Sequence, residues 1–307
     1  MKAWFAECPR PMIIAHRGAC GLLPEQTLSA FELAIEQGAD AIELDVVPTA
    51  DGVLVARHES ELSLSTNVAE DLQLAGYRNS REIEGALASG WFTTDLTVAQ
   101  VRQLGARQRL AFRDHSNDGR WPVPTLDEVL ELANARQVWV FIEIKQPAYF
   151  SSLGFAIDEL LLAVLSRHDA RRVVLQSFDS EFLRRLRGRT SLPIIQLIEN
   201  GPFDLDGIAI YAQGIGPWKR LIVPAVDDED GTTHALHPRL QSPTSLIADA
   251  HARGLLVSTW TFRDEPQFLA PEYGADALKE YVQFAQMGID AITTDFPATA
   301  VRALRDK

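Results

Sequence analysis

Residues 12–47 read MIIAHRGACGLLPEQTLSAFELAIEQGADAIELDVV and contain two short apolar runs separated by a longer amphipathic stretch. The second run, residues 41–47, is interrupted only by Glu43 and Asp45. Nearly continuous apolar runs are typical of strands that helices cover on both faces, as in a parallel sheet. Residues 25–37, between the runs, show the helical spacing of apolar residues. This stretch therefore predicts one strand–helix–strand unit of a parallel sheet.

The same alternation continues along the chain. Further strands are predicted at residues 138–144, 172–176, 193–197, 221–223, 255–260 and 291–294. Further helices are predicted at residues 126–135, 153–167, 180–188, 242–253, 275–287 and 297–305. With the first two strands this makes eight, which predicts a (β/α)8 TIM barrel, a fold of about 250 residues. A doubly wound open sheet is the alternative.

The polar stretch of residues 59–124 interrupts the alternation after the second strand. A structureless loop of that length is uncommon inside a compact domain. We therefore predict that it forms an inserted subdomain over the mouth of the barrel, within a single domain that spans residues 1–307.

The chain of 307 residues is 46% hydrophobic, enough for a large core, and carries a net charge of −13. This charge argues against binding to nucleic acid or to anionic membranes. An anionic substrate would need a local positive site, most simply a bound metal with Arg and Lys side chains. No segment approaches the ~20 apolar residues of a membrane span, so no stable membrane insertion is expected.

Residues 1–11 lack the continuous apolar core of a secretory signal. A cytoplasmic location is therefore expected, or a periplasmic one if a signal was removed. Cys8 and Cys20 are too few for a disulfide scaffold, although one bridge between them stays possible. The oligomeric state is left open.

Polar residues stand where the predicted strands end, which is where barrel enzymes place their catalytic groups. His16 and Arg17 follow the first apolar run, and Glu43 and Asp45 share one face of the second strand. A buried carboxylate without a partner is very costly, so a metal ion or an ion pair is expected beside these two acids.

Glu143 and Lys145 share one face of the third strand. One interpretation is a buried salt bridge between strands. The other is that Glu43, Asp45 and Glu143 form an all-oxygen site for one divalent cation, Mg²⁺ or Ca²⁺. Zinc is less favoured, because no His or Cys lies at close ligand spacing to these acids.

His58 follows the Asp51-Gly52 turn and a short apolar run, residues 53–57. On its own it would be an ordinary surface or capped histidine. With His16 across a metal it becomes half of an acid–base pair, in which either histidine could be the base.

Several motifs together resemble the glycerophosphodiester phosphodiesterase family. They cover nearly the whole chain, and the segments near residues 90–92 and 216–218 are similar to its longer bacterial, often periplasmic, branch. The motifs are Ile14-Ala15-His16-Arg17-Gly18, Leu23-Pro24-Glu25-Gln26-Thr27, Glu43-Leu44-Asp45, Asp51-Gly52 through Arg57-His58-Glu59, Gly90-Trp91-Phe92-Thr93, Pro124-Thr125-Leu126, Glu143-Ile144-Lys145, Leu175-Gln176-Ser177-Phe178 and Trp260-Thr261-Phe262-Arg263.

The resemblance implies a barrel with an insertion, and hydrolysis of glycerophosphodiesters to glycerol 3-phosphate and an alcohol through a cyclic phosphate. It implies that His16 and His58 are the acid–base pair and that Arg17 and Lys145 contact the phosphate. It also implies a divalent cation, Ca²⁺ or Mg²⁺, held by the residues Glu43, Asp45 and Glu143.

One motif departs from the family pattern. The family's Pro-Glu-Asn-Thr is Pro24-Glu25-Gln26-Thr27 here, so a contact made by the family's Asn is in doubt at Gln26. Glu25 is either a site residue or a helix N-terminal acid that favours the helix dipole.

Aromatic residues end three of the predicted strands. Phe178, Trp260 and Phe296 either line the mouth, where an apolar wall would suit the glycerol carbons, or pack in the core. The acidic run at residues 227–230 follows the sixth predicted strand and is either a solvated loop or a second cation site.

Three other functions are compatible with parts of this pattern. A phospholipase-D-like or lysophospholipid-cleaving enzyme would need an apolar membrane-contact patch, for which Trp91-Phe92 is the candidate. A metal-dependent aldolase or lyase could use the three acids but would not need both histidines. A non-catalytic phosphate-sugar binding protein would need no acid–base pair.

Overall fold

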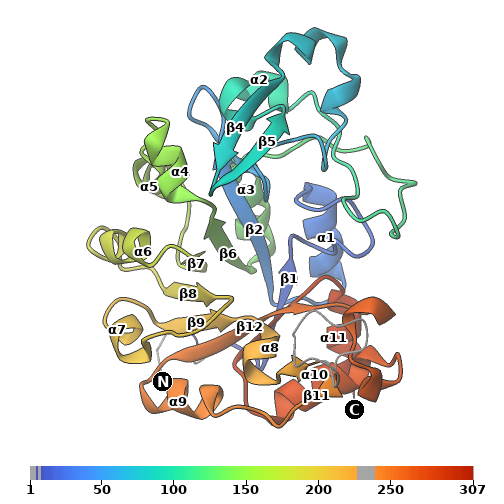
Figure 1. The fold of residues 1–307 in the computed structure, drawn as a ribbon, viewed down its shortest axis with the longest axis vertical. Coiled ribbons are helices and arrows are strands. Elements are labelled where there is room, and N and C mark those ends of the chain that lie inside the picture. The colour runs from blue at the N-terminus through green and yellow to red at the C-terminus, as the bar shows by residue number, and fades with distance from the viewer. Residues whose placement is uncertain (1–4, 6–7, 227–238, 307) are drawn as a thin grey trace.

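Eight parallel strands close into a barrel in the computed structural model, which describes residue 5, residues 8–226 and residues 239–306 (Figure 1). β1 pairs with β2 on one side and with β13 on the other, which closes the sheet. The predicted (β/α)8 barrel is confirmed. In spatial order its strands are β1 (Met12–His16), β2 (Ala41–Pro48), β6 (Trp139–Ile144), β7 (Val173–Ser177), β8 (Ile194–Ile198), β9 (Gly214–Pro217), β12 (Leu256–Phe262) and β13 (Ala291–Thr294).

Helices follow most of these strands, and polar side chains define where they begin. The Thr27 side chain accepts from the Ala30 amide at the start of α1, and Thr125 and Glu128 form a capping box at the start of α3. Among the described residues, the α-helices outside residues 59–124 are α1 (Leu28–Glu36), α3 (Leu126–Arg136), α4 (Pro147–Ser152), α5 (Ile157–Leu165), α6 (Ser180–Arg187), α7 (Leu205–Ala209), α8 (Lys219–Ile222), α9 (Leu246–Ala252), α10 (Ala277–Gln286) and α11 (Pro297–Leu304).

The prediction of a strand at residues 221–223 is wrong. The sixth barrel strand is β9, and residues 219–222 form the short helix α8. β9 has the sequence Gly-Ile-Gly-Pro, so it contains no apolar run that could mark it as a strand. Its neighbours require the small residues, because a Cβ on Gly214 would lie 2.7 Å from the Leu256 carbonyl oxygen.

Inward-facing side chains of the strands fill the barrel. Alternate residues of each strand point inward, and at the amino ends of the strands these residues are apolar, including Ile14, Ala41 and Phe141. Two residues further along the same strands, the inward positions are polar: His16, Glu43 and Glu143. The strand register brings these polar side chains together, because His16 pairs with Glu43 and Asp45 pairs with Glu143.

Residues 59–124 leave the barrel after β3 (Leu54–Ala56), which pairs antiparallel with β2. The segment projects at the top of Figure 1. Several of its apolar residues, such as Leu62, Leu96 and Val123, belong to the same core as β2. It contains η2 (Val68–Glu70), η3 (Leu72–Tyr77), the antiparallel hairpin of β4 (Asn79–Ile83) and β5 (Ala86–Gly90), η4 (Thr93–Asp95) and α2 (Val98–Val101).

Three further expectations concern the cysteines, a membrane span and the acidic run. Cys8 and Cys20 form no disulfide. Within the described part of the chain, no helix has the length and apolar character needed to cross a membrane. The acidic run at residues 227–230 lies outside the described residues.

Candidate active site

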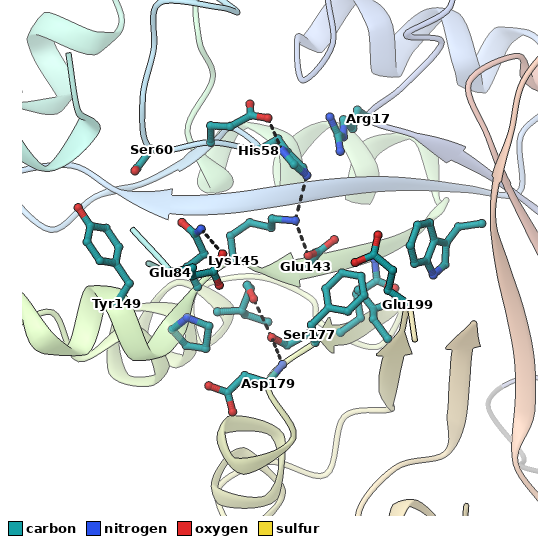
Figure 2. Close-up of a pocket in the computed structure, with 18 of the residues that line it drawn as sticks. Arg17, His58, Ser60, Glu84, Glu143, Lys145, Tyr149, Ser177, Asp179 and Glu199 are labelled. Atoms are coloured by element: carbon teal, nitrogen blue, oxygen red, sulfur yellow. Dashed lines mark hydrogen bonds and ion pairs between the residues drawn. The ribbon is translucent and has the colours of Figure 1, made fainter. Parts of the chain in front are cut away.

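A cavity of about 720 Å³ opens at the carboxyl ends of the barrel strands. The hairpin of β4 and β5 contributes Ile83, Glu84, Ala86 and Ala88 to its wall (Figure 2). Asp45 lies among the lining side chains but is itself fully buried. The cavity is lined by the other predicted site residues, which are His16, Arg17, Glu43, His58, Glu143, Lys145, Phe178 and Trp260.

Three buried carboxylates meet at the base of this site. Glu43, Asp45 and Glu143 each offer an oxygen atom, and these atoms lie within 4.8 Å of one another. Burial, followed by the charges of Asp45 and Glu143, raises the pKa of Glu43 well above its ordinary value. The Oδ1 atom of Asp45 is buried and accepts no hydrogen bond.

This cluster could hold a divalent metal ion. A cation would offset the mutual repulsion of the three carboxylates and bind Asp45 Oδ1, which forms an ion pair with Lys145 Nζ at 3.7 Å. All the oxygens offered are carboxylate oxygens, which suits a hard cation.

Arg17 is held among acids beside this cluster. Its backbone has a positive φ of 56°, and its Nη1 atom donates to both carboxylate oxygens of Glu25, each 3.1 Å away. Its Nε atom lies 3.1 Å from Asp45 Oδ2 in an ion pair. Glu25 precedes α1 by three residues, so its contact is with Arg17 and not with the amino end of that helix.

Gln26 reaches the carboxylate cluster despite its longer side chain. Its Nε2 atom donates to Asp45 Oδ2 at 2.5 Å, and the residue is fully buried with a positive φ of 62°. Arg57, also buried, donates to the Glu25 carbonyl oxygen at 3.0 Å and supports this backbone conformation. The departure from the family motif therefore keeps an amide in contact with the site.

His16 is oriented by a carboxylate that sequence reasoning missed. Its Nδ1 atom lies 2.6 Å from Asp295 Oδ1. Burial, together with the Arg17 charge, lowers the pKa of His16 to about 4, although Asp295 opposes this shift. His16 is therefore unprotonated at neutral pH. Asp295 directly follows β13, so the criterion that identified His16, a polar residue where a strand ends, could also have identified Asp295.

His58 has a similar arrangement on the segment that follows β3. Its Nδ1 atom lies 2.6 Å from Glu59 Oε1, and its Nε2 atom lies 3.0 Å from Lys145 Nζ. Lys145 also donates to Glu143 Oε1 at 2.7 Å, so it lies between His58 and the carboxylate cluster (Figure 2). Glu59 is a second carboxylate partner that sequence reasoning missed.

Phe178 and Trp260 form one wall of the cavity. Their rings meet edge to face with centroids 5.7 Å apart, and Trp260 Nε1 donates to the Gly216 carbonyl oxygen at 2.6 Å. Of the two alternatives for Phe296, a place in the cavity wall is excluded. Its ring packs on the turn at Gly21 and on Arg113, and it is absent from the cavity wall.

Comparison with known proteins agrees with this geometry. The sequence profile described as "Glycerophosphoryl diester phosphodiesterase family" matches residues 16–299. The glycerophosphodiester phosphodiesterase GDPD6 of Arabidopsis thaliana is 33% identical over 94% of this chain and 84% of its own length.

Solved structures share the fold. A putative glycerophosphoryl diester phosphodiesterase from Silicibacter pomeroyi is 25% identical, with a TM-score of 0.70 over 96% of this chain and 92% of that one. An Oleispira antarctica phosphodiesterase, solved in complex with the product sn-glycerol-3-phosphate, is 20% identical, with a TM-score of 0.67 over 98% of each chain. The chain therefore belongs to the glycerophosphoryl diester phosphodiesterase family, as its motifs predict, and is an enzyme of that family.

Proposed function

We propose that this protein hydrolyses glycerophosphodiesters, such as glycerophosphocholine or glycerophosphoethanolamine, to glycerol 3-phosphate and an alcohol. One observation carries the proposal: His16 and His58, each with Nδ1 close to a carboxylate oxygen, line one cavity beside a cluster of three acids. The Oleispira antarctica relative, bound to sn-glycerol-3-phosphate, supports a substrate of this size and charge.

In this mechanism His16 is the general base. It is unprotonated at neutral pH, and its Nδ1 contact with Asp295 leaves Nε2 as the acceptor. His16 removes the proton of the glycerol 2-hydroxyl, whose oxygen forms a bond to phosphorus. The bond from phosphorus to the leaving alcohol breaks, and water later opens the cyclic phosphate.

His58 is then the general acid that protonates the departing alkoxide. The Glu59 carboxylate, 2.6 Å from Nδ1, orients the His58 ring in the cavity. Positioned acid–base groups of this kind contribute about 10²- to 10⁴-fold each.

Positive charge at the site binds the phosphate. Arg17 and Lys145 line the cavity, and the Glu143 and Asp45 carboxylates outweigh the effect of burial and raise the pKa of Lys145, so it remains a cation. A divalent ion, Ca²⁺ or Mg²⁺, held by Glu43, Asp45 and Glu143 would neutralise charge on the non-bridging oxygens. Phe178 and Trp260 would contact the glycerol carbons.

Two leaving groups separate the roles of the histidines. We expect His16→Ala to abolish cleavage of both glycerophosphocholine and a p-nitrophenyl ester of glycerol 3-phosphate. His58→Ala should abolish only the first, because p-nitrophenolate leaves without protonation. A His58→Ala variant equally impaired on both substrates would contradict the assignment, and near-normal turnover in both variants would contradict the pairing. In wild type, ³¹P NMR should detect the cyclic phosphate.

A lysophospholipid-cleaving activity through the candidate patch is not supported. Phe92 is fully buried, and Trp91 donates through Nε1 to the Leu74 carbonyl oxygen at 2.7 Å, so neither side chain forms an exposed apolar surface. We propose that the substrate is a small water-soluble diester, and vesicle binding by the wild-type enzyme would contradict this.

A further inference from the structure

Arg113 reaches from the inserted segment to the carboxyl ends of the barrel strands. Its side chain is only 4% exposed. Its Nη2 atom lies 2.6 Å from Asp295 Oδ2, and its Nε atom lies 2.6 Å from Glu265 Oε1. Its Nη1 atom donates to the Cys20 carbonyl oxygen at 3.1 Å. One guanidinium therefore joins the segments that follow β1, β12 and β13.

The two carboxylate oxygens of Asp295 have different partners: one accepts hydrogen bonds from arginine side chains, and the other contacts the histidine. Arg113 and Arg263 both contact Oδ2, at 2.6 and 2.9 Å, while Oδ1 is left for His16 Nδ1. A carboxylate held in this way stays ionised and acts only as an acceptor. The His16 ring must then carry its hydrogen on Nδ1, which leaves the Nε2 lone pair for chemistry in the cavity.

We propose that Asp295 and Arg113 are positioning residues for His16, so that the inserted segment holds the catalytic base in its reactive tautomer and orientation. The proposal rests on the role of His16 in the proposed function. Neither residue lines the cavity, so each acts through the histidine.

A similar buried ion pair elsewhere supplies a matched control. Glu280 binds Lys219 at 2.7 Å and Arg220 at 3.1 Å, all three are nearly buried, and none of them lines the cavity. Arg220→Met should therefore disturb the fold about as much as Arg113→Met, without reaching His16.

The experiment measures kcat and KM on glycerophosphocholine for Arg113→Met, Arg113→Lys, Asp295→Asn and Arg220→Met. We expect Arg113→Met to lower kcat about 10- to 100-fold with KM nearly unchanged, and Arg113→Lys to recover part of the loss. Asp295→Asn, which is isosteric, should lower kcat by about 10²-fold or more, because an amide can hold the wrong tautomer. Arg220→Met should keep the wild-type kcat.

Nitrogen-15 NMR of histidine-labelled enzyme reads the tautomer directly. In wild type, His16 should show a hydrogen on Nδ1, and this signature should weaken in Arg113→Met and be lost in Asp295→Asn. Folded Arg113→Met and Asp295→Asn variants with wild-type kcat and tautomer would overturn the proposal, and so would equal losses in Arg113→Met and Arg220→Met. If Arg113→Met fails to fold, Arg113→Lys and Asp295→Asn decide the question.

The same data separate this inference from the proposed function. A fully active His16→Ala enzyme would refute the base role of His16. The tautomer measurements would still report whether Asp295 and Arg113 set the state of the ring.

Discussion

Removing one carboxylate from the cluster at the base of the site should have opposite effects on stability with and without a divalent cation. The perturbation is Glu43→Gln, which keeps the shape of the side chain and removes its charge. Glu43 is buried, and its pKa is raised by that burial and by Asp45 and Glu143. In metal-free protein the substitution should therefore raise the unfolding midpoint, because it removes a charge that burial penalises.

The sign of the pH dependence follows from the same shift. The folded metal-free state binds the Glu43 proton more tightly than the unfolded chain does, whose ordinary pKa is 4.5. The stability linked to this proton is present below pH 4.5 and is lost as pH rises towards the folded pKa. The advantage of Glu43→Gln over wild type should grow over that range in a chelating buffer.

With cation present the order should reverse. A cation at about 100 times its Kd stabilises the native state by about 2.7 kcal/mol. An unfolding entropy of about 2.1 cal/mol/K per residue then gives wild type, with 307 residues, a rise of about 4 °C. If the substitution weakens binding about 100-fold, the rise in Glu43→Gln should be below about 1 °C.

Differential scanning calorimetry in chelator, in Ca²⁺ and in Mg²⁺ measures these shifts. Glu199→Gln is the matched control, because Glu199 is exposed in the same cavity but lies outside the cluster. It should behave like wild type in all three buffers. A cation-induced rise in Glu43→Gln equal to that of wild type would refute the three-carboxylate site, as would a metal-free midpoint lowered by the substitution.

Three further outcomes test individual contacts. Gln26→Asn shortens the arm that reaches Asp45 at 2.5 Å and should weaken Ca²⁺ or Mg²⁺ binding by about 10-fold in titration calorimetry; unchanged affinity would contradict a supporting role. Trp260→Leu should raise KM several-fold with kcat nearly kept, whereas Trp260→Phe, which keeps an aromatic ring but loses the bond to Gly216, should raise it less. On the acid side of a pH series on wild type, kcat/KM should fall as pH drops towards about 4, the value to which the pKa of His16 is lowered, and an acid-side loss centred near 6.5 would contradict His16 as the base.

The barrel could be predicted because its strands are buried on both faces and read as apolar runs. The exception shows the limit of that signal. β9 is a barrel strand with two glycines and a proline in four residues, and it is recognisable only from its neighbours, which leave no room for a Cβ at Gly214. Leu221, by contrast, lies in an apolar run that forms a helix.

The site residues were predictable where a charged side chain stands inside an apolar run. Glu43, Asp45 and Glu143 stand inside strands, so the cost of burying a carboxylate marks them as unusual from their sequence neighbours alone. Glu59 follows His58, and Asp295 follows strand β13, but their sequence neighbours do not show that each carboxylate contacts a histidine.

The sequence by itself determined the barrel, the polar residues at the ends of its strands and the residue types of the site. These features show in short segments of sequence, because a buried strand reads as an apolar run and its side chains alternate between two faces. Only the tertiary structure decided which of these residues meet. His16 and Asp295 are 279 positions apart and come together because β1 pairs with β13 when the barrel closes. Arg113 joins them because the inserted segment folds back onto the same end of the barrel.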